Sequence, residues 1–222
     1  MAGARPLLIV LARAPVPRRV KPNLTPPLKP AQAARLYAAL VEDTVEVLLG
    51  FGFEADIEIH TDRETAAWPR LEIKRALQPA GGAGERLLQT LETGLASGHA
   101  PVAVFAGDTP SLPRAHVSLL LDSNADVTFG PADDGGFYAV SCRRTHPRMF
   151  DGVRWGTADT LQDALRATEA CGLSTALGNR WFDIDTPQDL KRLDGILPPR
   201  RSLAVLQRLN LTRPRRRVSS HS

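Results

Sequence analysis

The stretch "VAVFAGDTPSL" (residues 102–112) gives the strongest indication of the fold. Five consecutive apolar residues, 102–106, are typical of a short strand at the centre of a sheet, buried on both faces. Gly107 and Asp108 follow directly, and Pro110 stops the strand because proline has no N–H for the ladder. Ligands of open α/β sheets bind beside the carboxyl ends of the strands, so Asp108 is a candidate site residue.

Strand and helix patterns alternate on both sides of this run. Alternating or continuous apolar residues predict strands, and apolar residues spaced three or four apart predict helices. The predicted strands are 6–12, 55–61, 71–77, 102–106, 126–130, 136–142 and 173–177; the predicted helices are 29–50, 84–98, one within 112–123, one within 157–171, and a last one beginning at 186–193. Repeated strand–helix units indicate an α/β protein with a mostly parallel sheet covered by helices.

The strands 126–130 and 136–142 depart from this pattern. Only five residues separate them, which is too few for a helical crossover between parallel strands. We therefore expect an antiparallel element at this point of the sheet.

The basic charge of the chain is concentrated in its last part. Residues 196–222 hold seven arginines and no acid, so of the net charge of +4 they account for +7 and residues 1–195 for −3. We predict a single domain over residues 1–195 and a basic tail over 196–222, with a short helix carrying Leu203, Leu206 and Leu209 followed by a disordered end. A solvated tail is the more common role of such a sequence, so no nucleic acid is expected as a partner.

Several classes of protein are excluded by composition. No apolar stretch approaches the roughly 20 residues that a membrane-spanning helix needs, so we expect no membrane span. The N-terminal run "PLLIVLARA" resembles a first strand more than a signal peptide. Two cysteines, Cys142 and Cys171, predict neither a disulfide framework nor a zinc site, which favours reduced thiols and a cytoplasmic location.

The loop after the first predicted strand is basic. It reads "RAPVPRRVKPNL" (13–24) and offers Arg13, Arg18 and Lys21 to an anionic ligand. Loops that follow a strand often hold a phosphate in α/β proteins. This one contains three prolines and no glycine, so both a phosphate site and an ordinary basic loop remain open on the residues alone.

Acidic residues follow other predicted strands. Asp108 ends the central strand, Asp133 and Asp134 precede a glycine pair in "GPADDGGFY", and Asp183 and Asp185 stand two apart in "WFDIDTPQDL". At separate strand ends of one sheet, these carboxylates could converge on one Mg²⁺ or Mn²⁺, because hard cations take oxygen ligands. A cation there would stabilise the negative charge of a diphosphate leaving group.

Each acidic segment also has a purely structural interpretation. Asp108 suits a turn or the cap of the next helix, and the Asp-Gly pair at 134–135 suits a tight hairpin. Asp185 or Thr186 suits a helix cap, with Pro187 in the first turn. Taken alone, the segment 181–190 favours capping.

The order of the motifs resembles a known family. The segments "APVPRRVKPNLTPPL", "GERL", "GDTPSL", "GPADDGGFY", a tryptophan and "DIDTPQDL" are similar to those of a bacterial family of GT-A-type transferases. That family is named as a domain of unknown function and is often assigned to arsenosugar biosynthesis as a glycosyltransferase. It is distantly similar to the guanylyltransferases of molybdenum cofactor and of 2-phospholactate. The resemblance covers about residues 6–195.

The resemblance implies a fold and a set of roles. The fold would be the three-layer, GT-A-like α/β fold of nucleotide-diphospho-sugar transferases, with the nucleotide at the first loop. By resemblance, Lys21 would contact the phosphate, Asp108 and Asp185, with Asp183, would form the metal side, and Asp133, Asp134 and Gly135 the acceptor side. Arg13, Arg18, Gly84 and Arg86 are the further candidates for the nucleotide side. Trp155 matches a family tryptophan that precedes the predicted helix within 157–171.

The chain departs from the family where the nucleotide is expected. The family usually has "PVPGxVKTRL", and this chain has Arg18 for the glycine, Pro22 for the threonine and Asn23 for the arginine. Asparagine does not replace the bidentate phosphate contact of arginine, although Arg18 or Arg19 supplies charge nearby. The family's "GGDLGERL" is "AGGAGERL" (80–87) here, which loses an aspartate.

These features predict a metal-dependent transferase with a nucleotide-activated donor, most simply a glycosyltransferase. Its expected partners are a nucleotide sugar (or an NTP), a small-molecule acceptor and Mg²⁺ or Mn²⁺. One alternative is a nucleotidyltransferase that releases pyrophosphate. A second, motivated by the altered first loop, is a protein that keeps the fold and has lost donor binding.

Overall fold

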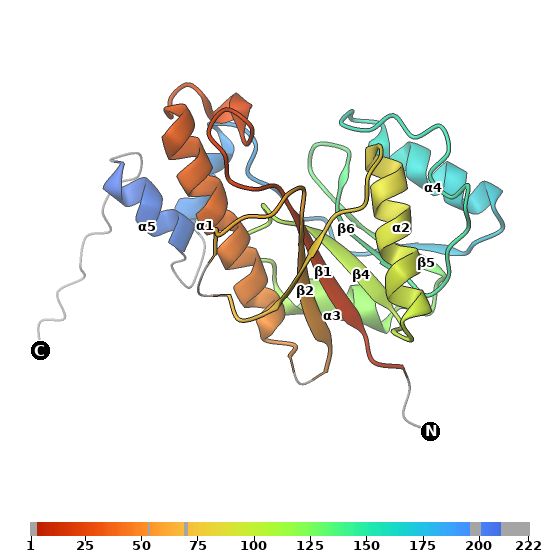
Figure 1. Cartoon of the computed structure of the whole chain (residues 1–222). Helices are drawn as coiled ribbons and strands as arrows, with labels where there is room; N and C mark the ends of the chain where they lie inside the picture. Colours follow the sequence, from red (N-terminus) through yellow and green to blue (C-terminus); the bar gives the residue numbers. More distant parts are fainter. Residues whose placement is uncertain (1–3, 53, 69–70, 196–200, 210–222) are drawn as a thin grey trace, which may run out of the picture.

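The buried run at 102–106 is the central part of a seven-stranded sheet in the computed structural model (Figure 1), which describes residues 4–52, 54–68, 71–195 and 201–209. The strands are β1 Leu7–Ala12, β2 Asp56–Thr61, β3 Lys74–Leu77, β4 Val102–Ala106, β5 Val127–Pro131, β6 Phe137–Cys142 and β7 Thr175–Leu177. The α-helices are α1 Pro30–Leu49, α2 Ala83–Ala96, α3 Arg114–Asp122, α4 Thr160–Ala170 and α5 Arg201–Arg208, and the 3₁₀ helices are η1 Pro22–Leu24 and η2 Asp189–Gly195. None of the described helices has the length and apolar character needed to cross a bilayer.

The sheet is mostly parallel, as predicted. Its strand order is β3-β2-β1-β4-β6-β5-β7. The pairs β1–β2, β1–β4, β2–β3 and β5–β7 are parallel, whereas β6 runs antiparallel to both of its neighbours, β4 and β5. The expected antiparallel element is therefore confirmed. Because β6 alone among the described strands is reversed, the loop from β5 to β6 lies at the same edge as the carboxyl ends of the other strands.

Helices cover both faces of the sheet (Figure 1). On β1, Leu8 and Val10 belong to the core beneath α1 and α3, while Leu7 and Ile9 belong to the core beneath α2 and α4. Successive strand side chains point to opposite faces, so one continuous apolar run supplies both cores. This explains why the central strands are apolar throughout rather than alternating.

The short helix α5 packs on the outer side of α1, where Leu206 joins a third cluster of buried residues. The buried carboxylate of Asp43 accepts hydrogen bonds from the backbone N–H groups of Arg201 (2.8 Å) and Ser202 (3.0 Å). A helix thus forms within the stretch expected to carry one. The other residues of the predicted basic tail, 196–200 and 210–222, lie outside the described residues.

The prediction of a last α-helix starting at 186–193 is wrong. This segment forms the 3₁₀ helix η2, and the last α-helix is α5. Gly195 and the prolines at 198–199 disfavour the continuation of an α-helix from this start.

Candidate functional site

The loops at one edge of the sheet carry the polar residues that the sequence singled out. Lys21 follows β1, Asp108 follows β4, Asp134 lies between β5 and β6, and Asp185 follows β7. These strand ends coincide at one edge because of the strand directions described above. The topology therefore brings together residues that are more than a hundred positions apart in the sequence.

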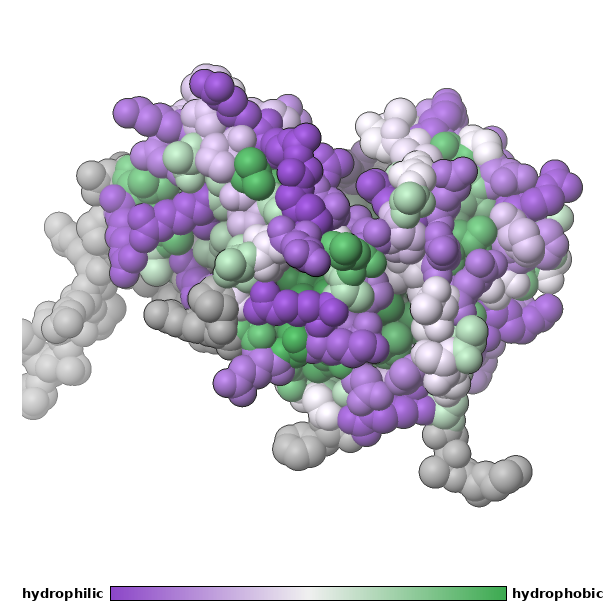
Figure 2. All heavy atoms as spheres, viewed as in Figure 1, coloured by the Kyte–Doolittle hydropathy of each residue, from purple (hydrophilic) through white to green (hydrophobic). Residues whose placement is uncertain are grey.

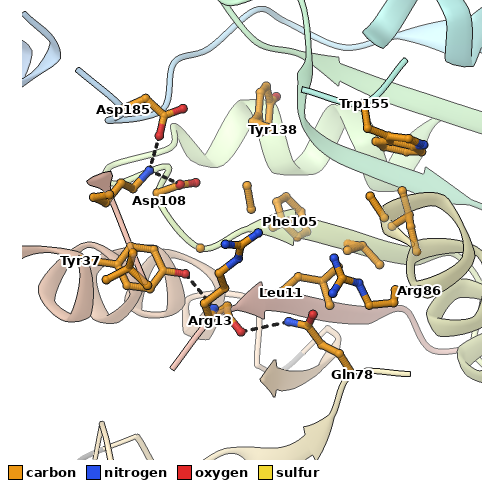
Figure 3. A pocket seen from close by; sticks show the side chains of 18 of the residues that line it. Leu11, Arg13, Tyr37, Gln78, Arg86, Phe105, Asp108, Tyr138, Trp155 and Asp185 are labelled. Carbon is orange, nitrogen blue, oxygen red and sulfur yellow. Dashed lines mark hydrogen bonds and ion pairs between the residues drawn. The ribbon is translucent and has the colours of Figure 1, made fainter. Parts of the chain in front are cut away.

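A cavity of about 450 Å³ opens at this edge. Figure 2 shows the surface hollowed between the α1 side and the α2 side, with hydrophilic residues around the opening. The floor is formed by the ends of β1 and β4, and the cavity is lined by Leu11, Ala12, Arg13, Arg19, Val20, Lys21, Pro22, Asn23, Tyr37, Gln78, Ala83, Arg86, Leu87, 104–108, 137–139, Trp155 and Asp185. One end is acidic and holds Lys21, and the other end carries arginines (Figure 3).

Lys21 joins two carboxylates at the acidic end. Its ammonium group donates hydrogen bonds to Asp108 and, at 2.5 Å, to Asp185, and only 6% of its side chain is exposed (Figure 3). Burial alone would lower the pKa of Lys21, but the charges of Asp108 and Asp185 outweigh it and raise the pKa above its usual value. Lys21 is thus a fully charged group that ties the β1 loop to the β4 loop and to the segment after β7.

The first loop adopts a backbone suited to glycine at two positions. Arg18 has a φ of +67° and Lys21 a φ of +49°, both in the left-handed region. Arg18 stands where the related family has glycine, so the loop keeps the glycine-like conformation without the glycine. Pro22 is the first residue of η1, where the missing N–H would have no helical partner.

The capping interpretation of the acidic residues is wrong for Asp108 and Asp185. The helix α3 begins after Pro113 without a side-chain cap, and the carboxylate of Asp108 is bound by Lys21. The turn at 185–189 is closed by Asp189, whose carboxylate accepts from the backbone N–H groups of Asp185 (3.2 Å) and Thr186 (2.8 Å). The carboxylate of Asp185 is therefore available to the site.

Three carboxylates form a compact group beside the cavity. Oxygen atoms of Asp134, Asp183 and Asp185 all lie within 4.8 Å of one another. Burial and the nearby negative charges of Asp185, Asp108 and Asp134 raise the pKa of Asp183. Burial alone would also raise the pKa of Asp185, but Lys21 reverses this and holds it below its usual value.

This group has the chemistry of a site for a hard divalent cation. Three carboxylate oxygens at short range are ligands that Mg²⁺ and Mn²⁺ accept. Burial, and after it the neighbouring carboxylates, raise the pKa of Asp183, and a cation would oppose both effects. The composition of the group differs from the expectation. Asp183 and Asp185 gather with Asp134, which was expected on the acceptor side. Asp108 is not part of this group of three, although Lys21 binds it as well as Asp185.

The two aspartates of the acidic loop have different partners. Asp133 forms an ion pair with Arg192 of η2, whose Nη1 donates to the carboxylate at 2.7 Å. Asp134 accepts a hydrogen bond from the backbone N–H of Gly136 at 2.8 Å and faces the other two carboxylates. Asp133 thus fixes the loop to η2, and Asp134 presents its charge to the site.

The other expected nucleotide-side residues divide into two groups. Arg13 and Arg86 line the cavity, as does Arg19, whereas Arg18 is exposed and is not among the lining residues. Gly84 packs closely against Trp155: a Cβ added to Gly84 would lie only 3.2 Å from the indole ring. Gly84 therefore makes room for a wall of the cavity.

Trp155 serves both the core and the cavity. Its ring contacts Phe137 and Phe150 edge-on, with centroid distances of 5.9 Å and 5.7 Å, and it also lines the cavity. The loop that carries it is held by Asp163 of α4, which accepts hydrogen bonds from the Nε (2.7 Å) and Nη2 (3.0 Å) of Arg154.

Sequence reasoning missed three polar lining residues, Tyr37, Tyr138 and Gln78. The tyrosines belong to apolar patterns that predict core positions. The Tyr37 hydroxyl accepts from the backbone N–H of Arg13 at 2.9 Å, and its burial near Asp108 raises its pKa, so it remains protonated. Gln78 is the residue that directly follows β3, and the strand-end argument applied to Asp108 would have found it.

One family model matches about half of the chain. The model of the family described as "Uncharacterized protein conserved in bacteria (DUF2064)" matches residues 51–157. This confirms the family resemblance; the matched residues include "GERL", "GDTPSL" and "GPADDGGFY" but neither the first loop nor "DIDTPQDL". No match was found among the curated proteins.

Solved structures confirm the fold over most of the chain. A protein from Desulfovibrio desulfuricans G20, named as a candidate nucleotide-diphospho-sugar transferase, is 26% identical, with a TM-score of 0.82 over 93% of this chain and 96% of that one. An inositol-1-phosphate CTP transferase from T. maritima is 13% identical, with a TM-score of 0.52 over 85% and 93% of the two chains. A nucleotidyl transferase from Methanothermobacter is 15% identical, with a TM-score of 0.54 over 86% and 96%. The chain therefore has the predicted fold of nucleotide-diphospho-sugar transferases.

Proposed function

We propose that the protein is a metal-dependent transferase that takes a nucleotide-activated donor and moves a glycosyl group to a small-molecule acceptor. The observation that carries the proposal is the arrangement of one cavity: carboxylates joined by Lys21 at one end and arginines at the other. A ligand that spans this cavity needs one group that binds a metal cation and other groups that bind arginine. The phosphate oxygens of a nucleoside diphosphate can do both.

The metal side would be formed by Asp134, Asp183 and Asp185. A divalent cation held there would neutralise the charge that builds on a nucleoside diphosphate as it leaves. Lys21 would keep Asp108 and Asp185 in place, because its two ion pairs connect their loops. Its charge is already balanced by these two carboxylates, so it acts first as a positioning residue.

The acceptor would meet the acidic loop between β5 and β6. Asp134 faces the carboxylate group and is the better placed of the two loop aspartates to orient an acceptor hydroxyl or to take its proton. Asp133 is engaged with Arg192 and would hold the loop in position. Trp155 and Phe137 would form an apolar wall beside the transferred group.

Nucleotidyl transfer is the second candidate. The fold is shared with the CTP transferase and the nucleotidyl transferase described above, and the same cavity and carboxylates suit an NTP that reacts with a phosphorylated acceptor. The two reactions differ in their products. Glycosyl transfer releases a nucleoside diphosphate, and nucleotidyl transfer releases pyrophosphate.

The test is a binding panel of nucleotides and nucleotide sugars, with and without Mn²⁺, followed by product analysis for the donors that bind. We expect Mn²⁺-dependent binding of at least one donor, and its loss in Asp185→Asn. Asp151→Asn is the matched control, because Asp151 is an exposed aspartate that pairs with the exposed Arg148. Failure of every donor to bind would overturn the proposal and favour a protein that has lost donor binding.

A further inference from the structure

A second hollow adjoins the arginine end of the cavity. It has a volume of about 240 Å³ and is lined by Arg13, Arg19, Asp62, Arg63, Gln78 and Arg86; we call it the arginine chamber. Arg13, Arg19, Gln78 and Arg86 line the main cavity as well, so the two hollows share a wall. Figure 3 shows Arg13, which follows β1, Gln78, which follows β3, and Arg86 of α2 on the same side of the cavity.

The chamber has a large excess of positive charge. Four guanidinium groups face one carboxylate, Asp62. That carboxylate is already engaged, since it accepts from the backbone N–H of Ala14 at 2.6 Å and from Nε of Arg63 at 3.4 Å. Within the part of the chain that the structure describes, the guanidinium groups of Arg13, Arg19 and Arg86 have no hydrogen-bond or ion-pair partner.

The nearest helix adds to this charge instead of balancing it. The start of α2 lines the main cavity through Ala83 and Arg86, and the N-terminal end of a helix carries a partial positive charge. The one acidic residue in the first turn of α2 is Glu85, and its carboxylate accepts from the backbone N–H of Gly82 at 2.7 Å. Glu85 therefore caps its own helix.

Gln78 gives the chamber a fixed floor. Its side-chain nitrogen donates to the backbone carbonyl groups of Ala12 and His60, at 2.9 Å each. These bonds tie the end of β3 to the ends of β1 and β2. The arginines therefore converge on a site whose floor is built into the sheet.

We propose that the arginine chamber binds a phosphate group of the substrate, additional to the phosphates that face Lys21 and the carboxylates. Several like charges from three separate segments, the loop after β1, the loop after β2 and the helix α2, repel one another unless an anion lies among them. The planar guanidinium fork matches phosphate oxygens in pairs. Because Lys21 is balanced by Asp108 and Asp185, the arginines supply the net positive charge that such a ligand meets. The inference extends the proposed function but does not depend on which group is transferred.

The phosphate has two possible sources, and both give the same contacts. It is either the terminal phosphate of a nucleoside triphosphate that runs from the main cavity into the chamber, or a phosphate on a separate small molecule. Inorganic pyrophosphate is the probe common to both. It is titrated calorimetrically into the full-length protein without a divalent cation, so that the carboxylates contribute no metal-mediated binding.

Pyrophosphate is expected to bind the unmodified protein, and Arg63→Gln and Arg86→Gln are each expected to weaken it about tenfold. Asp62→Asn is expected to strengthen binding several-fold, because it removes the one carboxylate that lines the chamber. Arg148→Gln, at an exposed pair that is not among the residues lining the chamber, is the control and should leave binding unchanged. Opposite effects at Arg86 and Asp62 separate a charge effect from a general loss of structure.

Three outcomes would overturn the proposal: no binding of pyrophosphate, binding that the two arginine variants leave intact, or binding that is lost in Lys21→Met and kept in Arg86→Gln. A matched NTP and NDP then identify the source. If the NTP binds more tightly than the NDP and this difference in affinity disappears in Arg86→Gln, the phosphate is the terminal phosphate of the NTP. If pyrophosphate still binds in the presence of saturating NDP, the phosphate belongs to a separate molecule. If donors bind and pyrophosphate does not, the proposal for the chamber is rejected and the proposed function stands. If pyrophosphate binds and no donor does, the proposed function is rejected and the proposal for the chamber stands.

Discussion

Gly135 shows how a single residue shapes the acidic loop. Its φ is +91°, and a Cβ built on it would lie 2.1 Å from the carbonyl oxygen of Ala158. Its own carbonyl accepts from the backbone N–H of Leu161 in α4 at 3.0 Å. Backbone packs directly on backbone here, which only glycine permits. The loop that presents Asp134 is therefore seated on the start of α4.

We predict that Gly135→Ala lowers the free energy of unfolding by about 3 kcal/mol, since it adds a steric clash to the strain of a positive φ. Gly152→Ala is the matched control: Gly152 has a φ of +72° with no atom within 4 Å of the added Cβ, so about 1 kcal/mol is expected. Urea denaturation of both variants measures the two values. Equal losses would show that the contact with Ala158 is not tight.

At the scale of elements, one carboxylate connects the Trp155 loop to α4. Asp163 accepts from the backbone N–H (3.2 Å), Nε (2.7 Å) and Nη2 (3.0 Å) of Arg154, and it also contacts Arg166. The hydrogen bonds from Arg154 hold the pKa of Asp163 well below its usual range. This clamp positions the residue next in sequence, Trp155, against the cavity.

A carboxyl whose pKa is lower in the folded protein stabilises the fold above its unfolded pKa, which is about 4 for aspartate. That stabilisation is lost as the pH falls through the folded pKa. We therefore expect Asp163→Asn to be less stable than the unmodified protein at pH 7, and the difference to shrink as the pH falls below about 4. Urea denaturation across this range measures it. Asp151→Asn, at an exposed pair, should show only a small difference at any pH, and a difference at Asp163 that grows with acidity would contradict the clamp.

At the scale of the whole molecule, Lys21 holds three distant segments together. Its ion pairs join the loops after β1 and β4 to the segment after β7, and the backbone N–H of Ile184 donates to the carbonyl of Asp108 at 3.2 Å. The first and last parts of the domain thus meet at the same place. Loss of the central charge leaves two carboxylates close together without compensation.

We predict that Lys21→Met lowers the free energy of unfolding by about 2 kcal/mol without metal; this is less than for a fully buried pair because 46% of the Asp185 side chain is exposed. Mn²⁺ should raise the melting temperature of this variant more than that of the unmodified protein, since a cation replaces the missing charge. Lys74→Met, at an exposed lysine paired with Glu58, should cost under 1 kcal/mol and gain nothing extra from Mn²⁺. Equal Mn²⁺ effects on all three proteins would argue against a cation at these carboxylates.

Most of the fold could be predicted from local patterns. The apolar run at 102–106 is a central strand, and the short gap before 136–142 correctly predicts a reversed strand. The exception is the segment after Thr186, where capping residues suggest an α-helix and the structure has a 3₁₀ helix. Local signals there mark a turn, and its length is limited by the glycine and prolines that follow.

The candidate site could be predicted only in part. Strand ends identify Asp108, Asp134 and Asp185, because the carboxyl ends of parallel strands meet at one edge whatever the loop lengths. The direction of each side chain is not a local property. Asp185 reads as a helix cap until Lys21, 164 positions away, is seen to bind it.

The sequence by itself determined the kind of protein: its elements, their order, the parallel sheet and the edge where polar residues collect. These follow from the periodicity of apolar residues and from the chemistry of turns, which act over a few residues. Only the tertiary structure decided which charges meet. The pairing of Lys21 with two carboxylates, the gathering of Asp134 with Asp183 and Asp185, and the arginine chamber each join loops from different strands. Such contacts depend on where each loop closes in space, and no local pattern encodes that.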